Sequence, residues 1–385
     1  MQHQEILHRC FRCGYCKLPG NYVDLNCPSY AKYRFETFSP GGRMWLLYAW
    51  VNKKIEPGKR FQEIMFSCAS CGNCVEHCTL PKIKDYLLEA FTAGKEELVN
   101  NGTVPPAVRD CLTKAYNHGN MYGLSKKKRG DWANGLNIEP YSDQEYLFYV
   151  GDVGSYDPRG QEIAGSVASL LKKEKISFGI LGKEELCDGN DAKAMGEGEL
   201  FKHLAEENIK KFNSLGVSKI ITLSPHAFNA MKNDYPFLEG SITIFHYSQI
   251  LERLVGNFKF KNSLETVKVT FHDPCYLGRH NMEYASVRKT LAAIPGVVPV
   301  EMDRCLQNSL CCGGGGGNVF TDILGGGPES PARSRIQEAA ETGAQILAVA
   351  CPVCAVMFED AVKAGNAENN IEVKEISEII NERLA

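Results

Sequence analysis

The sequence predicts a mixed fold: an N-terminal, largely helical α+β domain rich in cysteine, followed by an α/β region built from two similar halves. Three observations support this prediction. Two dense cysteine groups lie within residues 1–85, short apolar stretches alternate with amphipathic ones from residue 146 onward, and a cysteine/glycine pattern occurs once in each half of that region. Strands that alternate with helices are typical of parallel α/β sheets.

Short apolar or β-branched stretches in the second region are expected to be buried strands. They are residues 146–150, 176–181, 219–223, 242–245, 267–271, 297–301, 346–350 and 371–373. Helical patterns lie between them, as in residues 199–213, where Leu200, Leu204 and Phe212 fall near one stripe. A further helix is expected at 83–93, ahead of a segment rich in helix breakers.

The two halves of the α/β region form a degenerate repeat. Leu186-Cys187-Asp188-Gly189 corresponds to Leu310-Cys311-Cys312-Gly313, and Ser224-Pro225-His226-Ala227 corresponds to Cys351-Pro352-Val353-Cys354. The first copy keeps the framework but has lost nearly all of the thiols. The expected segments are the cysteine-rich domain 1–85, a helical connector 86–145, the degenerate copy 146–265 and the intact copy 266–385.

Composition places the chain among ordinary globular proteins, with 44% hydrophobic and 23% charged residues in 385 positions. A net charge of −3 gives no indication of a nucleic-acid partner. The N-terminus lacks the apolar core of a signal peptide, and the longest apolar run, residues 44–51, is too short to span a bilayer. Because a chain of this length needs no disulfides, its 16 cysteines indicate metal binding in a reducing, cytoplasmic compartment.

Two cysteine groups near the N-terminus have the spacing of ligands to cubane [4Fe–4S] clusters. They are Cys10, Cys13 and Cys16 with Cys27, and Cys68, Cys71 and Cys74 with Cys78. In the bacterial two-cluster pattern, the fourth cysteine of each group ligates the other cluster. We therefore expect one cluster on Cys10, Cys13, Cys16 and Cys78, and the other on Cys68, Cys71, Cys74 and Cys27. Paired zinc sites are the alternative, although zinc typically takes separated C-x2-C pairs.

A third cysteine group lies near the C-terminus, in turns that follow predicted strands. Its members are Cys275, Cys311, Cys312, Cys351 and Cys354. The adjacent Cys311 and Cys312 cannot easily both ligate one small ion, but they can ligate different irons of a larger cluster. The spacing therefore favours a multinuclear iron–sulfur centre, and the alternative is a zinc site in a docking platform.

The pattern Cys275…Cys311-Cys312-Gly313…Cys351-x-x-Cys354 resembles the cysteine-rich CCG domain of the heterodisulfide reductase family. With the N-terminal motifs, the chain resembles the D-type subunit of that family. It is also similar to the iron–sulfur partners of electron-transfer flavoproteins and of class II benzoyl-CoA reductase. The resemblance implies a noncubane [4Fe–4S] cluster on the five C-terminal cysteines, in addition to two ferredoxin-type clusters on the N-terminal cysteines.

The first copy departs from the family pattern. In the heterodisulfide-cleaving subunit each of two copies holds a noncubane cluster, whereas the corresponding positions here, near Gly151-Asp152, Asp188, Ser224 and Ala227, carry no thiol. Cys187 alone remains, and one cysteine cannot hold four irons. We therefore expect the first copy to be a metal-free scaffold.

These patterns favour an electron-relay subunit of an anaerobic redox complex, with a flavoprotein or a flavin-bearing reductase subunit as its partner. Any membrane attachment is expected to come through a partner. The alternative is a catalytic subunit that reduces disulfides or heterodisulfides at the noncubane cluster.

A few further residues near the motifs have competing interpretations. His272, Asp273 and His280 are candidates for steering protons or substrate, with ring packing or turn capping as the alternative. Cys111 is expected to be a small buried hydrophobe and Cys305 to be structural. The glycine run 313–317 is interpreted as a cluster-wrapping turn, because no phosphate-loop Gly-Lys-Ser/Thr follows it.

Overall fold

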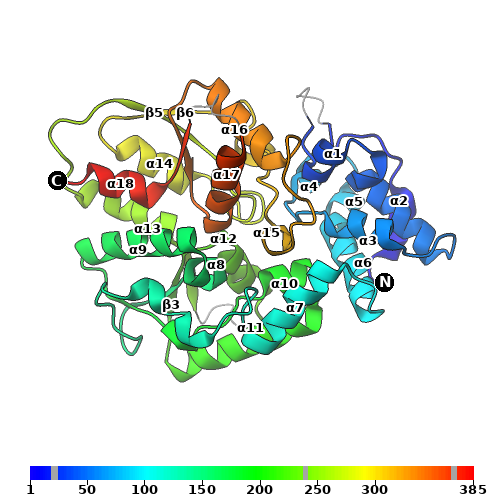
Figure 1. Ribbon diagram of the computed structural model, residues 1–385, viewed down its shortest axis with the longest axis horizontal. Coiled ribbons are helices and arrows are strands. Elements are labelled where there is room, and N and C mark those ends of the chain that lie inside the picture. The colour runs from blue at the N-terminus through cyan, green and yellow to red at the C-terminus, as the bar shows by residue number, and fades with distance from the viewer. Residues whose placement is uncertain (19–24, 237–241, 366–370) are drawn as a thin grey trace.

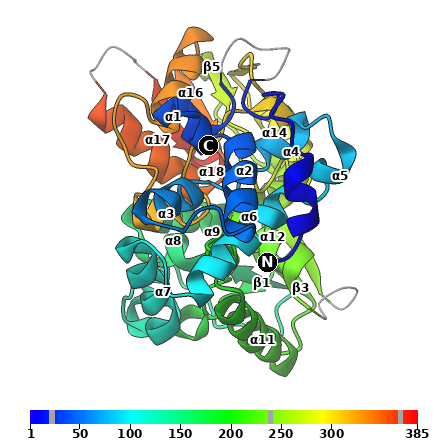
Figure 2. The same ribbon diagram turned by 90° about the vertical axis from the view of Figure 1, so that its right-hand side faces the viewer.

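The structure, a computed structural model, describes residues 1–18, 25–236, 242–365 and 371–385. Figure 1 shows the N-terminal helices gathered at one end of the molecule, beside two sheet-bearing units. Viewed from that end in Figure 2, the N-terminal helices lie in front of the junction between the two units. The CCG-like repeat therefore forms one body that carries the cysteine-rich N-terminal part on its side.

The N-terminal part is helical, as expected, but the predicted β component is absent from its described residues. Its α-helices are α1 (Pro28–Tyr33), α2 (Pro40–Val51), α3 (Lys59–Phe66), α4 (Asn73–His77), α5 (Pro81–Lys84), α6 (Leu87–Asn100) and α7 (Pro106–His118). The apolar residues between the cysteine groups have helical rather than alternating spacing, and α3 buries Phe61, Ile64 and Met65 on one face. The α+β expectation for this part is therefore wrong.

The helix expected at 83–93 is two helices. The short α5 ends at Lys84, Tyr86 leaves the helical region with φ −126° and ψ 12°, and α6 then continues to Asn100. The apolar faces of α6 and α7 share a core with Cys187, Met195 and Leu204 of the first sheet unit. The connector is thus packed against that unit.

Two parallel sheets confirm the α/β prediction, and every strand lies within three residues of its expected limits. The first sheet has the order β2-β1-β3-β4 and the second has the order β6-β5-β7-β8. The strands are β1 (Tyr146–Tyr149), β2 (Phe178–Gly179), β3 (Lys219–Thr222), β4 (Thr243–His246), β5 (Val267–Phe271), β6 (Val297–Val300), β7 (Ile346–Val349) and β8 (Glu372–Glu375). The identical order establishes the internal repeat.

Helices connect and cover these strands. In the first unit they are α8 (Gly151–Tyr156), α9 (Pro158–Lys173), α10 (Asn190–Ala194), α11 (Gly198–Ser214), α12 (Pro225–Asn229) and α13 (Tyr247–Leu254). In the second unit they are α14 (Ala285–Ala293), α15 (Asn318–Thr321), α16 (Pro331–Glu341), α17 (Pro352–Ala364) and α18 (Ile376–Arg383). Short 3-10 turns at 4–9, 126–128, 131–133 and 306–308 link several of the elements.

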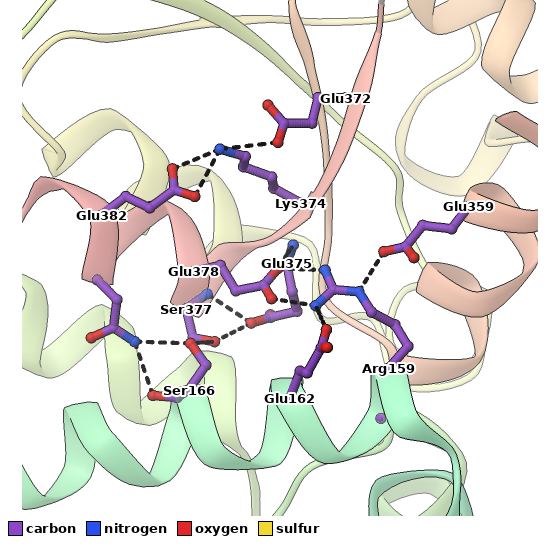
Figure 3. A network of polar contacts seen from close by, with 12 residues as sticks. Arg159, Glu162, Ser166, Glu359, Glu372, Lys374, Glu375, Ser377, Glu378 and Glu382 are labelled. Carbon is purple, nitrogen blue, oxygen red and sulfur yellow. Dashed lines mark hydrogen bonds and ion pairs between the residues drawn. The ribbon is translucent and has the colours of Figure 1, made fainter. Parts of the chain in front are cut away.

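The two sheet units are joined through α9, which packs against α17 and α18. Arg159 on α9 pairs with Glu359 of α17 and Glu378 of α18, as Figure 3 shows. In the same figure, Ser377 of α18 donates a 2.8 Å hydrogen bond to Ser166 of α9. These contacts fix the orientation of one sheet unit relative to the other. Among the described residues, no helix has the length and apolarity needed to cross a bilayer.

Candidate iron–sulfur sites

The first cysteine group lies at the surface end of the N-terminal part. Cys10, Cys13, Cys16 and Cys78 line one cavity together. Cys13 is exposed, whereas the other three are partly buried. Burial raises the pKa of the Cys16 thiol to about 12, so ionisation of this thiol requires a nearby cation.

The second group lies deeper and combines Cys27 with the Cys68–Cys74 motif. Cys74 is close enough to Cys68, Cys71 and Cys27 to be affected by their charges, and Cys16 also acts on it. Cys16 and Cys74 thus bring the first two groups next to each other.

Buried cations surround this second group. Burial opposes ionisation of Cys68, but the charges of Arg43 and Lys95 keep the pKa of this thiol below its ordinary value. Arg43 is held by Ser29 and Ser67 at 2.8 and 3.0 Å. Lys95 donates to the carbonyl oxygens of Ala194 and Cys68 at 2.8 and 3.3 Å. Both cations compensate negative charge on the sulfurs.

The third group gathers at the carboxyl edge of the second sheet, where ligands bind in open α/β folds. Cys275 follows β5 and Cys351 follows β7, which are adjacent strands. The Cys354 and Cys312 sulfurs are 3.4 Å apart, and all of the cysteines in this group are buried. The amide groups of Gly313 and Gly314 donate to the sulfurs of Cys311 and Cys312 at 3.3 and 3.5 Å.

The glycine run does more than wrap the third site. A Cβ at Gly315 would lie 2.5 Å from the carbonyl oxygen of Ala69, and one at Gly316 would lie 2.4 Å from that of Cys68. Only glycine therefore permits the two backbones to approach so closely. Through this approach the Cys68–Cys71 loop of the N-terminal part packs directly on the C-terminal cysteine site.

A thiol contact and two side chains complete this junction. The Cys71 thiol is hydrogen-bonded to that of Cys311, and this bond together with burial raises the pKa of Cys71 well above its ordinary value. Arg279 donates from Nε to the carbonyl oxygen of Cys71 at 2.7 Å. His280 lies 3.0 Å from the carbonyl oxygen of Ser70 through Nε2. The second and third cysteine groups are therefore in contact.

The equivalent site in the first sheet unit is occupied by polar groups. In the first sheet Leu147 of β1 pairs with Ile220 of β3, and in the second sheet Thr270 of β5 pairs with Leu347 of β7. When these two pairs are aligned, Asp152 corresponds to Cys275, because each lies five residues after the aligned residue of its strand. The remaining positions of the five-cysteine set are Cys187, Asp188, Ser224 and Ala227. One hydrogen bond of the intact site is retained here. The amide N–H of Gly189 donates to the Cys187 sulfur at 3.4 Å, as the amide N–H of Gly313 does to the Cys311 sulfur.

A buried ion-pair network borders this degenerate site. Arg129 pairs with Asp152 at 2.9 Å and with Glu185 at 3.2 Å, and all three side chains are at most 5% exposed. The guanidinium thus supplies the positive charge that carboxylates need in this interior position.

Three further residues considered in the sequence analysis, Asp273, Cys111 and Cys305, have neighbours that indicate structural roles. Asp273 accepts two hydrogen bonds from Arg288 and one from the Leu306 amide, so it anchors a turn. Cys111 is buried beside Met121, as expected. Cys305 is partly buried and has acidic and basic neighbours rather than thiols.

The donor sets fit iron–sulfur centres. Their thiols are mostly buried, gather in groups and accept backbone N–H groups, among them those of Arg12, Ser70 and Asn73. Cluster sulfurs are held by such N–H donors.

Sequence reasoning missed the buried cations at these sites, namely Arg43, Lys95, Arg129, Arg279 and Arg335. The sequence alone does not show that Arg43 acts on Cys68 or that Arg279 reaches Cys71, because these partners lie far apart along the chain.

Family models agree with this architecture. The model described as "Cysteine-rich domain" (CCG) matches residues 148–232 and again 269–359, and "4Fe-4S dicluster domain" matches residues 6–80. The chain belongs to the CCG-domain iron–sulfur protein family. Within this family, the "Probable iron-sulfur-binding oxidoreductase FadF" of Bacillus subtilis is 34% identical over 330 residues, which cover 83% of the chain and 46% of that protein.

Other members of the CCG-domain family are similar to the chain. The "EtfAB:quinone oxidoreductase" of Syntrophomonas wolfei is 31% identical over 83% of the chain and 46% of its own length. The D-type subunit of the dihydromethanophenazine:CoB--CoM heterodisulfide reductase of Methanosarcina barkeri is 29% identical over 98% of the chain and 94% of its own length. The chain thus spans about half of the first two relatives and nearly all of the third.

A solved structure has the same fold as this CCG-domain protein. The crystal structure of a hypothetical protein from Helicobacter pylori superposes with a TM-score of 0.59 over 100% of the chain and 72% of that protein, at 14% identity. At this identity the likeness concerns the fold alone.

Proposed function

We propose that the chain is the electron-transfer subunit of an anaerobic redox complex. One observation carries this proposal: the three cysteine groups lie next to one another as a series. Cys16 and Cys74 link the first group to the second, and Cys71 and Cys311 link the second to the third. Burial increases along the series, from the exposed Cys13 to the fully enclosed C-terminal group.

Each group has a proposed cofactor. Cys10, Cys13, Cys16 and Cys78 would hold one cubane [4Fe–4S] cluster, and Cys27, Cys68, Cys71 and Cys74 would hold a second. The third group, Cys275, Cys311, Cys312, Cys351 and Cys354, would hold a noncubane [4Fe–4S] cluster. Iron–sulfur clusters supply one-electron oxidation and reduction when they are bound. We infer that the degenerate site of the first unit stays metal-free, because Cys187 is the one thiol among its positions and Arg129 pairs with the carboxylates of Asp152 and Glu185.

The graded burial indicates where a redox partner approaches. The exposed Cys13 places the first group within reach of another protein, whereas the polypeptide around the third group excludes solvent. Relatives named for an EtfAB:quinone oxidoreductase and for a heterodisulfide reductase support a flavoprotein, or a flavin-bearing reductase subunit, as the partner. We place the complex in the cytoplasm, with membrane association through a partner.

A second candidate function is catalysis of disulfide or heterodisulfide reduction at the third group. A cavity of about 590 Å³ favours it, since Tyr276, the neighbour of Cys275, lines this cavity with Ser70 and His280. This volume lies in the range of small-molecule sites. In this case Cys312→Ser would abolish disulfide turnover while the signals of the two cubanes remain.

The experiment that tests the relay is a count of iron, acid-labile sulfide and zinc in protein purified without oxygen. About 12 irons per chain would support three four-iron clusters. About 8 irons with one zinc would overturn the proposal for the third group, because zinc would occupy the C-terminal thiols. Rapid disulfide reduction by the isolated protein with an artificial donor would favour the catalytic alternative.

A further inference from the structure

His272 lies close to two sulfurs of the third group. One of its ring nitrogens lies within 4.8 Å of both the Cys312 and the Cys354 sulfur, and the side chain is fully buried. The ring is fixed in place by Phe358, which packs edge-on against it at 4.7 Å between centroids. This arrangement allows two roles: the histidine is a metal ligand, or it donates a hydrogen bond to sulfur.

Arg335 decides between these roles through the other ring nitrogen. Its Nε–H donates to Nδ1 of His272 at 3.3 Å. The guanidinium is held in turn by Ser309 at 3.1 Å and Glu338 at 2.7 Å, so its orientation is set by further residues. A guanidinium has donors only. Nδ1 must therefore be the unprotonated nitrogen, and the ring proton of neutral His272 is on Nε2.

This tautomer is the wrong one for a metal ligand. A histidine that ligates through Nε2 carries its proton on Nδ1 and donates it to an acceptor such as a carboxylate or carbonyl. Here the group facing Nδ1 is itself a donor. The Nε2–H, by contrast, is buried and has no hydrogen-bond partner among the described residues. A buried donor without a partner is costly, which indicates that its acceptor belongs to the site.

We propose that His272 is a positioning residue that donates a hydrogen bond from Nε2 to a sulfur of the third group, that of Cys312 or Cys354, and that Arg335 selects the tautomer. This inference rests on the proposed iron–sulfur centre at that group. Hydrogen bonds to cluster sulfurs stabilise the reduced, more negative state and raise the reduction potential. The first unit has Tyr149 at the equivalent strand position, and its hydroxyl donates to the Leu186 carbonyl oxygen instead.

The test compares His272→Leu with His272→Gln in the full, anaerobically purified chain. Iron content and an electron paramagnetic resonance redox titration are measured for both, with Thr270→Val as a matched control from the adjoining strand. We expect about 12 irons in every variant. The potential of the C-terminal centre should shift to a lower value in His272→Leu, recover at least partly in His272→Gln, which keeps an N–H donor, and stay unchanged in Thr270→Val.

Three results would overturn the inference. Loss of about four irons in both His272 variants would show that His272 is a ligand. An unchanged potential in His272→Leu, with full iron, would show that no hydrogen bond reaches the sulfurs. An equal shift in the Gln and Leu variants would assign the effect to packing. A wild-type chain with only about 8 irons would instead refute the third centre itself, which separates that failure from the failure of this inference.

Discussion

Arg279 donates a 2.7 Å hydrogen bond from Nε to the backbone carbonyl oxygen of Cys71, and so joins the C-terminal cysteine site to the second N-terminal one. The same guanidinium donates from Nη1 to the carbonyl oxygen of Ser309 at 2.7 Å. Its charge also acts on Cys71, Cys275 and Cys311. A buried cation thus lies where two proposed electron carriers meet.

Arg279→Met should lower the reduction potentials of both centres, because a positive charge beside their sulfurs is lost. The substitution also leaves two buried carbonyl groups without a donor, which costs on the order of 1–3 kcal/mol each. Redox titration and thermal unfolding measure the two effects. The exposed Arg60→Met, whose partner is Glu63, is the control. Equal potentials in wild type and Arg279→Met would refute the electrostatic role.

Gly315→Ala should separate the N-terminal part from the third cysteine group. The new Cβ would lie 2.5 Å from the Ala69 carbonyl oxygen, so one of the two loops must move. Gly326→Ala is a matched control in the same segment, since nothing lies within 4 Å of its Cβ. We expect slower electron transfer between the centres and a lower melting temperature for Gly315→Ala alone, measured by stopped-flow reduction and calorimetry. Equal behaviour of the two variants would disprove the close approach.

Iron counts of double variants test whether the fourth cysteine of each N-terminal motif ligates the cluster of the other motif. If Cys10 and Cys78 hold the same cluster, then Cys10→Ala, Cys78→Ala and the double variant should each retain about 8 irons. Cys10→Ala combined with Cys27→Ala should retain about 4, because the two residues belong to different clusters. The reverse pattern would show that each motif keeps its own fourth cysteine.

Asp188 should make stability depend on pH. Burial, and then the charges of Asp152 and Asp191, raise the pKa of this carboxyl to about 7, although an amide hydrogen bond from Asn190 opposes the shift. The unfolded value is about 3.9. The stability associated with the protonated form is therefore complete below about pH 4 and lost as pH rises through about 7.

Asp188→Asn should remove this dependence, so that the variant loses less stability than wild type between pH 5 and pH 8, by on the order of 2 kcal/mol. His226 also faces this carboxyl, and its charge opposes the shift. Denaturant unfolding at several pH values gives the slopes, with the exposed Asp303→Asn as the control. Parallel slopes for wild type and Asp188→Asn would contradict the buried, protonated carboxyl.

Local patterns in the sequence determined most of the fold. Strand positions such as 267–271 and 346–350 were predictable because buried parallel strands are short, apolar runs, and the structure confirms them. The repeat was visible because turns at equivalent places need the same Gly and Pro residues. The predicted β component is absent from the described residues of the N-terminal part, where short helices such as α3 and α4 flank the cysteine-rich loops.

The sequence by itself determined which cysteines are candidate metal ligands, because ligand spacing is a local property of the chain. Only the tertiary structure decided how the groups are connected. Arg279 and Cys71 are 208 positions apart, and Arg335 and His272 are 63 apart, so no local pattern announces either contact. These pairs arise because parallel strands place their carboxyl ends at one edge and a glycine run lets a distant loop reach that edge. Because these charges and N–H groups are buried, water cannot replace a missing partner, and each unpaired group would cost free energy.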